Sequence, residues 1–173
     1  MFNIRPEQHQ DIMAIRTVNN LAFKGEGEAK LVEAIRASAF FVPELSLVAV
    51  TNEGAEVIGH VMFSTISIET SSGTVPTLGL APMAVSPDYQ QQGIGSALIR
   101  AGLKKCEELG YEHVVVLGHP DYYPKFGFVP AHTKGIACPF PVPAEVFMVL
   151  ETKSGSLSGI NGTVQYPPAF NAV

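Results

Sequence analysis

The hydrophobic positions along the chain switch between helical spacing and short apolar runs, and this pattern predicts the order of its elements. Residues 2–5 are a short strand candidate, and Pro6 after them suits the first turn of a helix. That first helix ends near Phe23 and is indicated by residues three to four positions apart, which are Ile12, Ile15, Val18 or Asn19, and Phe23. A second amphipathic helix follows a break at residues 24–27 and ends near Ser38, with Leu31, Val32 and Ile35 on its apolar face.

Three strands in succession are predicted in the next part of the chain. Residues 45–50 and 57–68 are rich in β-branched side chains, and a polar turn at residues 51–54 separates them, which is the pattern of a hairpin. A second turn at residues 71–73 leads into a strand at residues 78–85. We therefore expect the N-terminal half of the sheet to be antiparallel.

The C-terminal half of the pattern begins with a third helix. Its apolar stripe is formed by Ile94, Leu98, Ala101 and Leu109, and Gly110 ends it. Residues 114–117 are wholly apolar, as expected of a strand buried on both faces, and strand, helix and strand here predict a right-handed crossover. An aromatic turn, an irregular loop, a last core strand and an edge-strand candidate follow at residues 118–129, 138–143, 146–150 and 164–166. The fold class is therefore α/β (α+β), with a mixed sheet flanked by helices.

Composition narrows the classes of function. The 173 residues are 46% hydrophobic, enough for one core of ordinary size, and we expect a single domain. A formal net charge of −5 disfavours nucleic acid and membrane surfaces as partners. The two cysteines, Cys106 and Cys138, have no metal-ligand spacing and are too few for a disulfide framework, so we expect two reduced core thiols and no metal. Because the N-terminus lacks the features of a signal peptide, we expect a cytoplasmic protein.

The junction at residues 80–100 carries the strongest chemical signal. A strand ends at Ser86, three glutamines follow, and Gly93 and Gly95 open a helix whose first amides have no partner within it, which makes an anion site. The third glycine of a dinucleotide-binding loop is missing, since Leu98 stands there, and the Gly-Lys-Ser/Thr of a P-loop is absent. Pro82 cannot donate to a ladder, so we expect its strand to be bulged or unpaired on one side and able to accept an extended ligand. An amide-bearing molecule that ends in a pyrophosphate, such as coenzyme A, fits both features.

Two motifs carry a family resemblance. The loop Gln90-Gln91-Gln92-Gly93-Ile94-Gly95 resembles the Gln/Arg-x-x-Gly-x-Gly/Ala loop of the GNAT superfamily of acyl-CoA N-acyltransferases, and the run from Tyr123 to Phe128 resembles that family's Tyr-x-x-x-Gly-Phe. The short Gly118-His119-Pro120-Asp121 segment before the tyrosine looks like a subgroup of predicted bacterial N-acetyltransferases. The resemblance covers about residues 1–151. It implies the GNAT fold, a strongly twisted mixed sheet that is splayed at the strand before the glycine loop, with residues 152–173 as an extension packed on the same domain.

The resemblance also implies an activity. It predicts an N-acetyltransferase in which acetyl-CoA is the co-substrate and a primary amine of a small molecule or peptide attacks the thioester directly. Backbone groups of Met83, Ala84 and Val85 would pair with the pantetheine arm. The implied binding loop for the pyrophosphate comprises Gln90, Gln91, Gln92, Gly93, Ile94, Gly95 and Ser96. Tyr123 matches the tyrosine that protonates the departing thiolate, although packing against Tyr122, Phe126 and Phe128 is an alternative role for it.

Several features leave alternatives open. The strand at residues 78–85 contains no carboxylate that would take a proton from the amine, and we assign none of the other candidates, which are Glu26, Glu28, His60, Glu69, His119 and Asp121. Glu26 and Glu28 lie where relatives bind the acceptor and would suit a cationic amine, but they also suit a helix start. The alternative function is a non-catalytic acyl-CoA sensor or regulatory module. A second alternative is an enzyme of the same fold that uses a longer acyl donor or an oxygen acceptor. The chain is expected to be a monomer or a homodimer, with the apolar residues 166–170 available for a second subunit.

Overall fold

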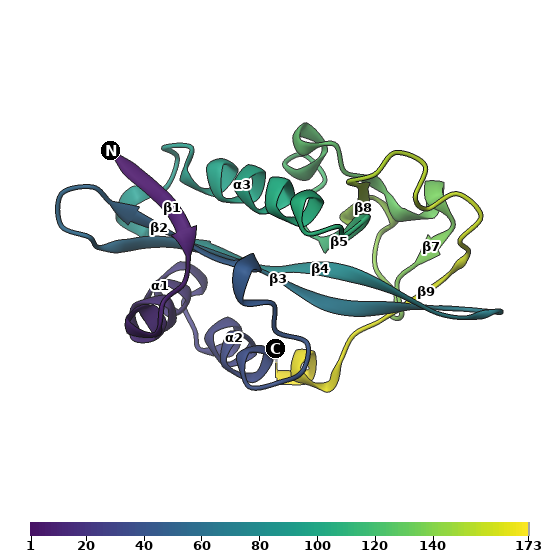
Figure 1. The fold of residues 1–173 in the computed structure, drawn as a ribbon, viewed down its shortest axis with the longest axis horizontal. Helices are drawn as coiled ribbons and strands as arrows, with labels where there is room; N and C mark the ends of the chain where they lie inside the picture. Colours follow the sequence, from purple (N-terminus) through teal and green to yellow (C-terminus); the bar gives the residue numbers. More distant parts are fainter. Residues whose placement is uncertain (173) are drawn as a thin grey trace.

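One twisted sheet with helices on both faces forms the protein in a computed structural model, which describes residues 1–172 (Figure 1). Within those residues nine strands join in the order β1-β2-β3-β4-β5-β8-β6, and β9 pairs with both β3 and β7. The strands are β1 (Phe2–Pro6), β2 (Ser46–Thr51), β3 (Val57–Thr70), β4 (Gly73–Val85), β5 (His113–Leu117), β6 (Val129–Pro130), β7 (Ile136–Ala137), β8 (Phe147–Glu151) and β9 (Gly162–Gln165). The α-helices are α1 (Ile12–Phe23), α2 (Gly27–Arg36) and α3 (Ile94–Glu108).

The N-terminal half of the sheet is antiparallel throughout. β1 pairs with β2, β2 with β3, and β3 with β4, which confirms the predicted succession of hairpins. Pro6 does not begin a helix, and that prediction is wrong, because Pro6 is the last residue of β1 and lies opposite Leu47. A 3-10 turn at His9–Asp11 comes before α1 instead, and Asp11 holds it by accepting hydrogen bonds from the Arg5 guanidinium at 2.6 Å and the Gln8 amide at 2.7 Å.

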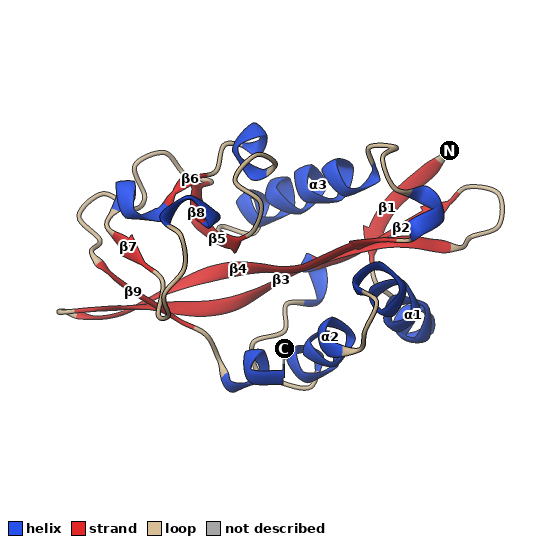
Figure 2. Ribbon diagram, turned by 180° about the vertical axis from the view of Figure 1, so that it is seen from behind, coloured by secondary structure: helices blue, strands red, loops and turns tan. Residues whose placement is uncertain are grey.

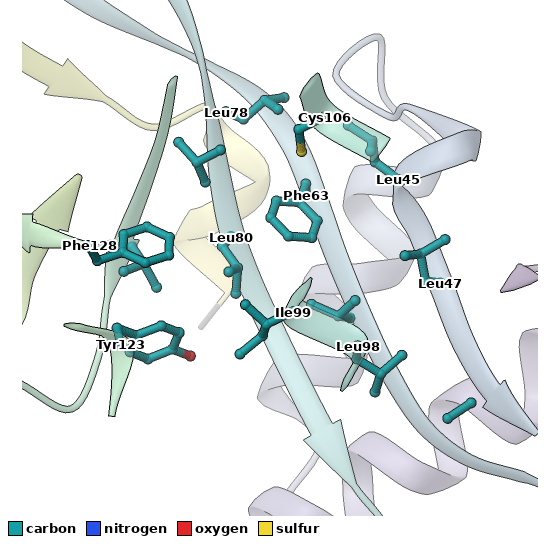
Figure 3. Packing of buried hydrophobic residues seen from close by; sticks show 14 of the residues in the cluster. Leu45, Leu47, Phe63, Leu78, Leu80, Leu98, Ile99, Cys106, Tyr123 and Phe128 are labelled. Carbon is teal, nitrogen blue, oxygen red and sulfur yellow. The ribbon is translucent and has the colours of Figure 1, made fainter. Parts of the chain in front are cut away.

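The helices divide between the two faces of the sheet, with α3 on one and α1 and α2 on the other (Figure 2). The face under α3 holds the cluster around Phe63, Leu80, Leu98 and Ile99 (Figure 3). Leu109, predicted to belong to the apolar stripe of α3, is 41% exposed, because it lies beyond the last helical turn at the C-cap. The buried residues of α3 are Ile94, Leu98, Ile99, Gly102 and Cys106.

The C-terminal half joins the sheet in both directions. β5 is parallel to β4 and antiparallel to β8, and its residues 114–116 are buried whereas Leu117 is exposed. The predicted edge strand is β9, which lies between β3 and β7 rather than at a free edge. The final 3-10 turn at Pro168–Ala172 lies beside α2, where Ala169 and Phe170 pack on the chain's own core (Figure 1).

A buried hydrogen-bonded chain ties α1 and α2 to the sheet. His60 is fully buried on β3, with Nδ1 3.4 Å from the Asn19 amide nitrogen and Nε2 2.9 Å from the Ser46 hydroxyl oxygen. The Ser46 hydroxyl donates to Glu7, which also accepts two hydrogen bonds from Arg36 at 2.9 and 3.0 Å. When His60 is neutral with its proton on Nε2, every donor in this series of hydrogen bonds has an acceptor. Burial, with a smaller contribution from the Arg36 charge, lowers the pKa of His60 to about 3.

This buried histidine makes stability depend on pH. The folded-state pKa lies below the ordinary value of about 6.5, so the folded protein binds fewer protons than the unfolded chain in acid. Stability from the neutral ring is present above pH 6.5 and is lost as pH falls towards 3, at up to about 1.4 kcal/mol per pH unit. We expect the contribution of His60 to the free energy of unfolding, measured with urea, to be about 2 kcal/mol smaller at pH 5 than at pH 6.5.

A His60→Gln variant should be less stable at pH 7 but should lose that part of the pH dependence. A matched His9→Gln change, at an exposed histidine, should leave the pH dependence as it is in the unmodified protein. If the free energy of unfolding changed equally with pH in the unmodified and His60→Gln proteins, this prediction would be contradicted.

Candidate active site

The edge of β4 is open where the site lies. β4 pairs with β5 only at Leu78–Val114 and Gly79–Val115, after which β5 continues beside β8. On the other edge the ladder with β3 shifts register between Val61 and Phe63, opposite Pro82, and the Ala81–Pro82 peptide bond is cis. The prediction that Pro82 interrupts the pairing of its strand is confirmed. Backbone groups of residues 80–85 therefore face a gap between β4 and β5 that an extended ligand can enter.

The glycine loop places a helix N-terminus at the end of this gap. Gly93 is the N-cap of α3 and has a φ of +83°, a left-handed conformation that favours glycine. The first amide to bond within the helix is that of Ala97, 3.0 Å from the Gly93 carbonyl, so the amides of residues 94–96 remain available to an anion. The Gln90 side chain donates to the Val85 carbonyl at 3.0 Å and so fastens the loop to the end of β4.

An aromatic turn closes the other side of the gap. Residues Tyr123–Phe126 form a 3-10 turn, and Tyr123 packs edge to face against Tyr122 and Phe128, with ring centroids 5.2 and 5.7 Å apart. Figure 3 shows Tyr123 beside Phe128 with its hydroxyl oxygen directed towards β4. A side chain on Gly118 would overlap the Tyr123 ring, because even Cδ2 of that ring would lie 2.9 Å from an added Cβ. Glycine at position 118 therefore leaves the space that the Tyr123 ring occupies.

These three elements line one cavity of about 660 Å³, which we call the donor cavity. It brings together all but one of the site residues predicted from the sequence, namely Met83, Ala84, Val85, Gln90, Gln91, Gly93, Ile94, Gly95, Ser96 and Tyr123. The remaining one, Gln92, is exposed beside the cavity's loop and is not part of its lining. Of the candidate bases, His119 is the one that the described residues place in the lining.

The other candidate bases lie elsewhere. His60 is enclosed in the core, and Glu69 lies exposed in the β3–β4 hairpin, opposite Thr74. Glu26 is exposed 3.9 Å from Lys30, and Glu28 lies in the first turn of α2, so both suit a helix start. Asp121 is exposed outside the described lining of the donor cavity.

Tyr123 is a neutral phenol in this setting. Its side chain is 9% exposed, and burial, with a smaller contribution from Tyr122, raises its pKa to about 12. It therefore keeps its proton throughout the neutral range and is able to donate it to a base inside the cavity.

Three residues of the lining are not predicted from the sequence. The sequence gives Tyr122 only a packing role, yet its hydroxyl lies 3.3 Å from that of Ser96 at the start of α3. The Lys125 ammonium lies 4.1 Å from the centroid of the Tyr122 ring and adds a positive charge to the lining. Phe23 lines the cavity from the end of α1, where it is 40% exposed. Tyr122 and Lys125 are signalled by their place beside Tyr123, whereas the helical spacing of α1 does not distinguish Phe23 from the other apolar residues of that helix.

Comparison with known proteins places the chain in a family. The sequence pattern of the Acetyltransferase (GNAT) family matches residues 12–128. The N-acetyltransferase YhbS of Escherichia coli K12 is 36% identical over 97% of this chain and 98% of its own length. A crystal structure of the E. coli YhbS protein in complex with CoA has a TM-score of 0.90, with 35% identity over 98% of this chain and 92% of that one.

A second solved structure agrees with the first. A GNAT acetyltransferase from Brucella melitensis in complex with acetyl-CoA has a TM-score of 0.79, with 32% identity over 98% of both chains. The predictions of a GNAT fold and of an acyltransferase are therefore confirmed. The chain belongs to the Acetyltransferase (GNAT) family.

Proposed function

We propose that the protein transfers the acetyl group of acetyl-CoA to a primary amine of a small molecule or peptide. The observation that carries this proposal is the donor cavity, because it joins an open strand edge, a helix N-terminus and a buried tyrosine in one space. Two similar proteins were crystallised with coenzyme A or acetyl-CoA, which supports the same donor here.

The residues divide the work of binding along the cavity. Met83, Ala84 and Val85 pair through their backbone groups with the amides of the pantetheine arm, as a neighbouring strand would. The loop from Gln90 to Ser96 surrounds the pyrophosphate with backbone amides and the positive end of the α3 dipole. Lys125 adds a positive charge that favours the phosphates.

The reaction needs one proton removed from the amine and one given to sulfur. The amine nitrogen forms a bond to the acetyl carbon, the carbon–sulfur bond breaks with its electron pair on sulfur, and Tyr123 donates the proton that makes the thiol. The free amine forms first, when the ammonium group loses a proton to solvent, and the nitrogen loses the one further proton counted above after its bond to the acetyl carbon has formed. We assign no residue to either transfer. Solvent re-protonates Tyr123 after the thiol leaves.

The location, oligomeric state and domain bounds of the protein are further parts of the proposal. None of the described helices is long and apolar enough to cross a membrane. Within the described residues, no three His, Cys, Asp or Glu side chains are grouped to hold a metal ion. We propose a cytoplasmic monomer or homodimer that does not bind nucleic acid, with residues 1–151 as the GNAT domain and residues 152–173 as an extension of it. Pairing of β9 with β3 supports that last assignment.

Two measurements on one protein preparation test the proposed function. Calorimetry should show stoichiometric acetyl-CoA binding, and a screen of amines with acetyl-CoA should release free thiol in an amine-dependent way. Binding of acetyl-CoA without turnover of any amine would favour the alternative of a non-catalytic sensor. Faster turnover with a longer acyl-CoA, or with an alcohol as acceptor, would replace the proposed donor or acceptor.

A further inference from the structure

A second cavity, of about 540 Å³, adjoins the open edge of β4, and we call it the acceptor pocket. Its wall is formed mainly by apolar side chains from α2, β4, β5, the 138–143 loop and the C-terminal segment, and Asn171 adds one carboxamide. The apolar side chains include Leu31, Leu80, Leu117, Phe140, Tyr166 and Phe170. Its volume is in the range of sites that enclose small molecules.

The acceptor pocket and the donor cavity follow one another along the same two strands. On β4, residues 79–81 line the acceptor pocket and residues 83–85 line the donor cavity, with buried Pro82 between them. On the other side of the gap, Val115 and Leu117 line the acceptor pocket, and the turn that follows β5 brings His119 and Tyr123 to the donor cavity. A thioester carried along residues 83–85 would therefore end at the boundary of the two, beside Tyr123.

The acceptor pocket is uncharged among the residues that the structure describes. Of its ten described lining residues, none is acidic or basic, and the acidic residues at the start of α2, Glu26 and Glu28, are not among them. Tyr166 stacks on Phe140 with ring centroids 6.2 Å apart and an interplanar angle of 26°, and its ring lies 4.9 Å from that of Phe170. These three aromatic residues lie outside the part of the chain that matches the family's sequence pattern.

An uncharged aromatic wall selects among amines. A second positive charge would lose its hydration there and meet no carboxylate among the described lining residues, only neutral groups such as the Asn171 carboxamide, which penalises diamines and guanidinium compounds. A single ammonium group is affected differently, because desolvation lowers its pKa and favours the free amine that attacks the thioester. Such a pocket therefore helps to supply the nucleophile without a carboxylate on β4.

We propose that the acceptor is a small primary amine whose aromatic or branched aliphatic group fills the acceptor pocket. This inference rests on the proposed function, since the pocket accepts an amine only if the donor cavity presents the acetyl group. The overall reaction is amine plus acetyl-CoA giving the N-acetyl amine and the free thiol, with one proton passing from nitrogen to solvent and one from Tyr123 to sulfur.

A comparison of four amines tests the inference: 2-phenylethylamine, 3-methylbutylamine, putrescine and agmatine. We expect kcat/KM to be roughly 10- to 100-fold higher for the first two, as for groups that fill a hydrophobic pocket. Preference for putrescine or agmatine, or release of thiol with none of the four in a protein that binds acetyl-CoA, would overturn the inference. Failure to bind acetyl-CoA would instead overturn the proposed function.

A matched pair of variants connects the preference to the acceptor pocket. Leu117 and Leu109 are 43% and 41% exposed, but only Leu117 is among the described lining residues of the pocket. Leu117→Asp should raise KM for 2-phenylethylamine about tenfold or more and reduce the difference in kcat/KM between 2-phenylethylamine and putrescine, with acetyl-CoA affinity unchanged. Leu109→Asp should change neither KM for 2-phenylethylamine nor the preference for it over putrescine. Equal changes in these quantities in the two variants would contradict binding of the amine in the acceptor pocket.

Discussion

The Gly93→Asp variant is expected to bind acetyl-CoA at least about 100-fold more weakly than the unmodified protein, a loss of about 2.7 kcal/mol or more. Gly93 is the N-cap of α3 and lines the donor cavity. A carboxylate there would face the pyrophosphate at close range and occupy the amides that the phosphates need. Calorimetric titration with acetyl-CoA measures the effect directly, and intact affinity would remove this loop from the proposed site.

The charge effect can be separated from the backbone effect. The +83° φ of Gly93 is unfavourable for other residues, but Asp and Asn tolerate it best, so Gly93→Asn carries a similar conformational cost without the charge. Gly110, at the other end of α3, has a φ of +88° and is also exposed, so Gly110→Asp provides the charge without the cavity. We expect affinity to fall much less in Gly93→Asn than in Gly93→Asp and to stay unchanged in Gly110→Asp.

The donor side of the site was predictable because its signals are local. A proline in a strand, glycines at a helix start and an apolar period each constrain the backbone within a few residues. Pro82, Gly93 and the end of β4 at Val85 lie where these signals indicate, although β4 begins at Gly73, before the predicted start at residue 78. The local sequence does not place Pro6 correctly, because proline suits both a strand end and a helix start, and only the pairing with Leu47 in the folded protein distinguishes the two.

The acceptor side was not predictable because contacts between distant segments create it. Leu31, Leu117 and Phe170 each follow an ordinary apolar pattern, and they share a pocket only after α2, β5 and the C-terminal segment have packed together. The C-terminal residues 166–170 were expected to be available to a second subunit, since their local sequence gives no sign of the cavity that they help to enclose. Phe23 and Tyr122 joined the donor cavity for the same reason.

Replacement of the Tyr123 hydroxyl should lower kcat by roughly 100-fold or more with a competent amine, the size of effect expected when a general acid is removed. Tyr123→Phe keeps the ring that packs against Phe128, so the fold and the affinity for acetyl-CoA should be retained. Tyr122→Phe is a matched control, because Tyr122 lines the same cavity but is not the proposed acid. Its hydroxyl oxygen instead lies 3.3 Å from the Ser96 hydroxyl oxygen. Unchanged turnover in Tyr123→Phe, or a larger fall in Tyr122→Phe, would exclude Tyr123 as the acid.

The raised pKa of Tyr123 sets the pH dependence of this step. Full proton transfer from a phenol of pKa about 12 to a thiolate whose conjugate acid has a pKa near 8.5 in water is unfavourable by about 5 kcal/mol. Burial of the thiolate raises the pKa of its conjugate acid and so reduces the difference between the two pKa values. A group with pKa about 12 stays protonated well above neutrality, so kcat should show no loss from tyrosine ionisation between pH 8 and about 10.

Gly118→Ala places a methyl group against the Tyr123 ring without removing the hydroxyl, and it should lower kcat while leaving acetyl-CoA affinity unchanged. Normal turnover in Gly118→Ala together with slow turnover in Tyr123→Phe would mean that the hydroxyl acts from a less restricted position than the structure gives it.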